Sequence, residues 1–152
     1  MGKAAVPKMV EAKIASYLES ASWNTVPYKC YESIGGEMPL NPFMRVAVSQ
    51  ATERPSQSGN FLCNVDLSAH TGMDPEYDLD FYEAGNFHSI LCGNINESLI
   101  EIENSNLNGT ITGYTNTLAV FDIRITSFNR EIDTTNGVFE DNWDLEIYCN
   151  VS

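Results

Sequence analysis

The chain has 152 residues and carries 21 acidic and 8 basic side chains, which gives a formal net charge of −13. This length suits one domain with a core that needs neither metal nor disulfide bonds to be stable. With 43% hydrophobic and 11% aromatic residues, the chain is not a disordered acidic tail. The negative charge also argues against a protein that neutralises nucleic-acid phosphates or docks on anionic lipid.

The charge is distributed unevenly along the chain. Residues 1–45 contain five bases and four acids, whereas residues 46–152 contain three bases and seventeen acids. Almost all the net negative charge therefore belongs to the later part of the fold. It is either an ordinary solvated surface or a surface past which a charged molecule slides without binding.

No segment approaches the roughly 18 consecutive apolar residues of a membrane span. Lys8, Glu11 and Lys13 interrupt the N-terminal region where a signal peptide would need an apolar stretch. We therefore expect a cytosolic protein, in which cysteines are small core residues and a zinc site built from scattered cysteines is disfavoured. The four cysteines are Cys30, Cys63, Cys92 and Cys149.

The first part of the chain predicts a helix and a hairpin. Pro7 suits the first turn of a helix, and apolar residues then recur at helical spacing through Ala21. Residues 22–43 are rich in proline, glycine and aromatic residues, which indicates an extended segment packed against the fold. Alternating residues over 44–49 and 61–68 predict two antiparallel strands joined by a polar loop.

An acidic stretch over residues 71–85 lacks the calcium-loop pattern, because its glycine and its final glutamate do not fall at the required positions. We expect a solvated loop that leads into a helix capped by Asn86 and ending near residues 104–106. His88 lies on this helix, and we expect it to be exposed or to play a supporting role.

The last third predicts β-structure over residues 110–114, 119–126 and 143–151. Asn136-Gly137 is a strong hairpin turn signal. The hairpin around it would be longer than the sheet from which it grows, and a neighbouring subunit would cover it. The whole chain, 1–152, is thus predicted to be a single α+β domain. It would have a mainly antiparallel sheet of about four to five strands, two helices packed against the sheet and a long C-terminal hairpin.

No motif for chemistry stands out in the sequence. The chain has no GxSxG elbow, no GxGxxG and no phosphate-binding loop, and its two histidines, His70 and His88, lie outside nucleophile and zinc motifs. We predict no enzyme activity, no catalytic residue, no cofactor and no metal.

The chain resembles bacteriophage tail terminator (tail completion) proteins. The resemblance rests on the opening helix, the segment from Val26-Pro27 through Pro39-Leu40-Asn41-Pro42, and the strand Met44–Ser49. A polar tip with Gly59 follows, and after it come the strand Phe61–Ser68, the helix Asn86–Glu103 and a final strand entered through Asp141-Asn142-Trp143.

The resemblance implies a virion structural protein, assembled in the host cytoplasm and located in the tail or neck. It implies a homo-hexameric ring at the head-proximal end of the tail tube, which ends tube elongation and joins the tail to a head–tail connector or stopper protein. DNA would pass through the lumen without specific binding. The alternatives are another neck or connector (stopper) protein or minor tail subunit and, from a different class, a small monomeric binding module.

For such a ring, the residues predicted at a subunit or tube interface gather at the C-terminal hairpin, with one arginine from the polar loop. They are Arg54, Arg130, Asp133, Asn136, Gly137, Val138 and Phe139.

Overall fold

The computed structural model describes residues 5–20, 29–32, 43–54, 59–72, 81–110, 113, 115–133 and 138–152. The described elements are α1 (Val6–Ser20), β1 (Lys29–Glu32), β2 (Phe43–Glu53), β3 (Asn60–Gly72), α2 (Phe81–Glu101), the 3-10 helix η3 (Asn104–Leu107), β4 (Gly109–Thr110), β5 (Thr117–Asp133) and β6 (Val138–Val151).

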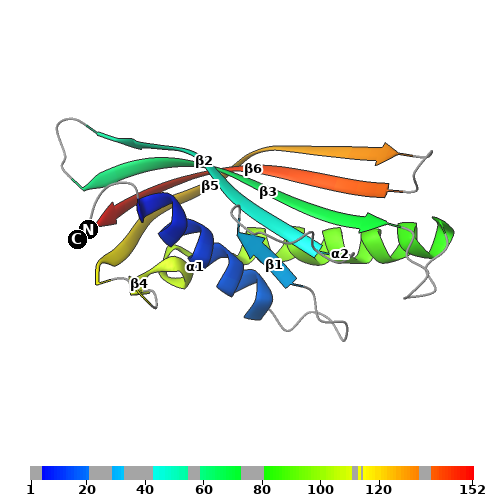
Figure 1. Ribbon diagram of the computed structural model, residues 1–152, viewed down its shortest axis with the longest axis horizontal. Coiled ribbons are helices and arrows are strands. Elements are labelled where there is room, and N and C mark those ends of the chain that lie inside the picture. Colours follow the sequence, from blue (N-terminus) through cyan, green and yellow to red (C-terminus); the bar gives the residue numbers. More distant parts are fainter. Residues whose placement is uncertain are drawn as a thin grey trace.

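The strands form one sheet in the order β1-β2-β3-β6-β5-β4. Strands β2 to β6 pair antiparallel, and β1 adds to the edge of β2 in parallel. Figure 1 shows α1 and α2 on the same side of this sheet. The predicted α+β class, with two helices on a mainly antiparallel sheet and a long C-terminal hairpin, is confirmed.

The core lies between the sheet and the two helices. Along β3 and β6 every second residue is buried, as the alternating sequence pattern predicts for a sheet covered on one face. Trp143 is fully buried, and its Nε1 donates a hydrogen bond to Asn96 Oδ1 of α2 at 2.8 Å. All four cysteines are buried and free, as predicted.

Two polar contacts fix α1 within this arrangement. At the irregularity after Val48 in β2, the Val48 backbone N–H donates to Glu11 Oε1 at 2.9 Å, which gives a buried carboxylate a backbone partner. The Tyr17 hydroxyl donates to the Ser98 carbonyl at 2.8 Å and links α1 to α2. Helix and sheet are thus joined by satisfied hydrogen bonds as well as by apolar packing.

Several predicted boundaries are wrong. Helix α2 already includes Phe81, so Asn86 lies inside the helix instead of capping it. Strand β2 runs on to Glu53, which makes the β2–β3 loop shorter than predicted. Strand β2 continues through the polar residues Gln50, Thr52 and Glu53, because backbone pairing does not require apolar side chains at the end of a strand, whereas α2 begins five residues before the cap residue that the sequence suggested.

The C-terminal hairpin is long, as predicted, but it does not outgrow the sheet. Strand β3 pairs with β6 as far as Gly72 opposite Val138, so it supports the hairpin almost to its tip. Along most of the outer side of β5, no described strand pairs with the hairpin. The predicted turn residues Asn136 and Gly137 lie outside the described residues, as do most of segments 22–43 and 71–85.

Candidate functional site: a free sheet edge, an acidic face and a polar cluster

Strand β5 has an open outer edge over most of its length. Strand β4 pairs only with Thr117 and Leu118. The next backbone groups of β5 form hydrogen bonds with side chains of the η3 region. Asn108 Oδ1 accepts one from the Val120 N–H, and Asn104 Nδ2 donates one to the Phe121 carbonyl, both at 2.7 Å. From residue 122 to residue 133, no described strand lies on the outer side. We call this stretch the β5 edge.

The β5 edge carries apolar side chains that the fold leaves uncovered. Ile125, Phe128 and Ile132 are 42%, 48% and 51% exposed, and we call them the apolar stripe. Their partners in β6 are Leu145, Trp143 and Phe139, all of which are buried, so the stripe belongs to the helix-side face. Helix α2 packs mainly on β3 and β6, and near Ile132 it borders a cavity that it shares with β5.

This edge has the properties of a strand-pairing surface. Unpaired backbone groups combined with exposed apolar side chains are a template for a further strand, and monomeric proteins usually block such edges. A strand added beside β5 would continue the core face and cover the apolar stripe.

The opposite face of the sheet, which we call the open face, is strongly acidic. The pairing register places six acids on it with two arginines, Arg45 and Arg124, and a third arginine, Arg54, reaches it by stacking on Tyr148. The acids are Asp66, Asp122, Glu131, Glu140, Asp144 and Glu146. No helix of the described chain covers this face (Figure 1).

Two pairs of these acids stand directly opposite one another across the strands. Asp66 faces Asp144, and Glu131 faces Glu140. Partial burial is the main cause that raises the pKa of Asp66, and the hydrogen bond and negative charge of the neighbouring Asp144 raise it further. Like charges placed directly opposite destabilise a sheet, so this arrangement is not explained by stability of the subunit.

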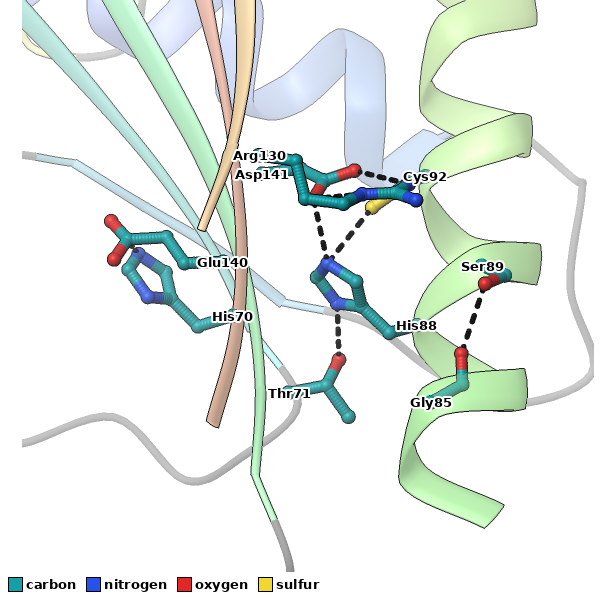
Figure 2. A network of polar contacts seen from close by, with 9 residues as sticks. All are labelled: His70, Thr71, Gly85, His88, Ser89, Cys92, Arg130, Glu140 and Asp141. Carbon is teal, nitrogen blue, oxygen red and sulfur yellow. Dashed lines mark hydrogen bonds and ion pairs between the residues drawn. The ribbon is translucent and has the colours of Figure 1, made fainter. Parts of the chain in front are cut away.

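A third feature is a polar cluster on the helix side of the sheet, near the end where β5 leads into β6, made of Thr71, His88, Cys92, Arg130 and Asp141 (Figure 2). Asp141 is completely buried and accepts two hydrogen bonds from Arg130, Nε to Oδ1 and Nη2 to Oδ2, each at 2.9 Å. His88 places Nε2 at 3.2 Å from Asp141 Oδ1, while its Nδ1 lies 2.9 Å from Thr71 Oγ1. The cluster therefore links α2 to β3, β5 and β6.

The charges of the cluster follow from these contacts. Burial raises the pKa of Asp141, but hydrogen bonds from Arg130, Cys92 and His88 outweigh burial and hold the pKa below its usual value. Burial lowers the pKa of His88 despite the neighbouring carboxylate. At neutral pH the cluster thus contains a carboxylate, a guanidinium and a neutral imidazole.

The cluster is not arranged as a thiol nucleophile. Burial, and next the hydrogen bond to Asp141, raise the pKa of Cys92, so its side chain stays a thiol at neutral pH. Reactive cysteines need a lowered pKa and access to solvent, whereas Cys92 is 4% exposed.

The structure separates the residues that the sequence predicted at an interface. Arg130 lies on the β5 edge, but its guanidinium binds the buried Asp141. Phe139 is buried and packs against the His88 ring instead of facing outward. Arg54 lies at the far end of the sheet, where it stacks on Tyr148 with its guanidinium carbon 5.0 Å from the ring centroid.

Of the remaining residues of that set, Asp133 and Val138 are among the described residues, and Asn136 and Gly137 are not. Asp133 ends β5 and pairs with Val138, the first residue of β6, while the turn itself lies outside the described residues. The sequence prediction missed the polar cluster and the apolar stripe. Cys92 and His88 share a helix at a spacing of four, but nothing in the sequence places them beside Asp141.

Comparison with known proteins leaves the family open, since no family model and no curated protein matches this sequence. In the described part of the chain, no helix is long and apolar enough to cross a membrane.

Proposed function

We propose that the protein is a virion structural subunit that forms a ring at the head-proximal end of a phage tail tube. The ring ends elongation of the tube and joins the tail to the head connector. The β5 edge is the observation that carries this proposal, because it offers unpaired backbone and an apolar stripe to a second copy. The phage role itself rests on the sequence resemblance described above.

The geometry of the sheet favours a ring over a closed dimer. Among the described residues, no strand pairs with the outer side of β2 beyond Val46, where the Val48 N–H donates to Glu11 of α1. The β2–β3 and β5–β6 hairpins extend from opposite ends of the molecule (Figure 1). Pairing between two different edges is a head-to-tail contact, and such contacts form a ring when the rotation closes.

The acidic open face supports a lumen through which DNA passes. Opposed carboxylates, such as Asp66 with Asp144, repel phosphates and offer them no binding site. With this face turned inward, DNA would move through the ring without adhering. With it turned outward, the acids would serve solubility alone. A neighbouring neck ring, such as a stopper, would use the same two surfaces and is the second candidate.

The experiment uses tail tubes that lack their terminal ring. We expect the protein to bind one end of each tube as a single ring, visible by electron microscopy, and to stop further addition of tube subunits. Binding to the head connector but not to tubes would transfer the assignment to a neck ring. A protein that stays monomeric with both partners would contradict the proposal.

A further inference from the structure

The polar cluster contains three strong metal-ligand atoms that converge. His88 Nε2 lies 3.3 Å from Cys92 Sγ and 3.2 Å from Asp141 Oδ1, and all three donor atoms lie within 4.8 Å of one another. Imidazole nitrogen, thiolate sulfur and carboxylate oxygen are the ligand types that zinc takes in proteins. The three residues are buried, and two of them share one face of α2 at a spacing of four.

The spacing of these donor atoms suits a tetrahedral ion. Zinc bonds of about 2.0–2.3 Å at tetrahedral angles place neighbouring ligand atoms about 3.3–3.6 Å apart. The observed separations of His88 Nε2 from the other two donors are 3.2 and 3.3 Å. These two separations are close to the tetrahedral values, and the third, between Cys92 Sγ and Asp141, is no more than 4.8 Å.

The surroundings hold the donors in a suitable orientation. In the tautomer that a metal ligand requires, His88 Nδ1–H donates a hydrogen bond to the Thr71 hydroxyl oxygen, and Nε2, which carries the proton and donates to Asp141 when no ion is bound, is unprotonated and directed at the site. Arg130 Nη2 holds Asp141 Oδ2, so the carboxylate keeps this hydrogen bond when Oδ1 exchanges its hydrogen bond from Arg130 Nε for an ion. Arg130 also opposes the ion, because its own positive charge is close.

A cavity next to the cluster provides entry and room for a further ligand. It has a volume of about 310 Å³. Its lining residues come from α2, β5 and β6 and include His88, Arg130, Ile132 and Phe139. Three protein ligands with an accessible fourth position form an open site, to which water or a side chain of another molecule could bind.

We propose that His88, Cys92 and Asp141 bind one zinc ion that bridges α2 and β6. On binding, the Cys92 sulfur exchanges its proton for the metal, and the proton leaves to solvent. The ion would strengthen the contact between the helix and the strand next to β5. The proposal does not depend on the ring, because zinc binding can be measured on the isolated chain.

The test is zinc titration of the metal-stripped protein against a chromophoric chelator, with thermal melting as the second readout. We expect one zinc ion per chain and a higher melting temperature. Cys92→Ala should weaken zinc binding at least about 100-fold and remove the thermal shift, whereas Cys30→Ala, a buried cysteine elsewhere in the core, should bind as the parent does. The proposal would be overturned if Cys92→Ala and the parent bound zinc equally tightly, or if the parent bound no zinc.

Two further measurements keep the test independent of how the cysteine variant folds. Cobalt added to the parent protein should give the charge-transfer absorption of a thiolate ligand, and its absence would exclude Cys92 as a ligand. Arg130→Gln should bind zinc more tightly than the parent, because it removes a cation beside the ion. Weaker zinc binding by folded Arg130→Gln would count against the proposed site.

Discussion

Replacing Ile132 with glutamate is expected to prevent assembly while leaving the subunit folded. Ile132 is half exposed in the subunit, so the substitution places a charge in solvent. In a strand-paired assembly the same charge would be buried, at a cost of about 3 kcal/mol per contact. That cost corresponds to roughly 100-fold weaker association, which sedimentation velocity can measure alone and with tail tubes.

Helix α2 supplies the matched control for this prediction. Ile90 is 60% exposed, comparable to Ile132, but it lies on α2, away from the β5 edge. Ile90→Glu should therefore assemble as the parent does, with an unchanged circular dichroism spectrum. If Ile132→Glu and the parent associate equally strongly, the apolar stripe is not the contact between copies.

The largest loss of stability is expected from Asp141→Ala. This carboxylate accepts from Arg130, His88 and Cys92, so its removal leaves several donors without their buried acceptor. Breaking a buried charge pair in this way destabilises by about 3–5 kcal/mol. The Arg130 side chain is 47% exposed and can turn to water, so we expect about 3 kcal/mol, near the lower limit of that range.

Urea unfolding followed by tryptophan fluorescence measures this loss of stability. Glu140→Ala is the control, since the neighbouring Glu140 lies on the open face opposite Glu131 and its removal leaves the buried cluster intact. Its free energy of unfolding should change by no more than about 0.5 kcal/mol. Equal, small effects of both substitutions would show that the polar cluster contributes little to stability.

The sequence predicted the class of fold because the signals for it are local. The alternation along β3 and β6 and the helical spacing in α1 record which side of each element is buried. Element ends were less accurate: β2 continues through polar residues whose backbone hydrogen bonds are independent of side-chain pattern, and α2 begins at Phe81, before the predicted cap at Asn86.

The candidate sites were harder to predict because they depend on pairing between distant segments. Arg130 belongs beside Asp141 only through the register of β5 with β6, and His88 reaches them only because α2 crosses the same end of the sheet. The exposure of Phe128 and Ile132 likewise depends on where α2 stops covering the sheet. The acidic character of residues 46–152 was visible in the sequence, but its concentration on the open face was not.

Hydrogen exchange along β5 tests the central claim most directly, because it reports whether the β5 edge acquires a partner. In the free subunit, the outward-directed amides between residues 122 and 133 should exchange rapidly, while β6, paired on both sides, stays protected. On assembly with itself or on a tail tube, those β5 amides should become protected. Assembly that leaves their exchange unchanged would contradict the account, since copies would then be joined through another surface.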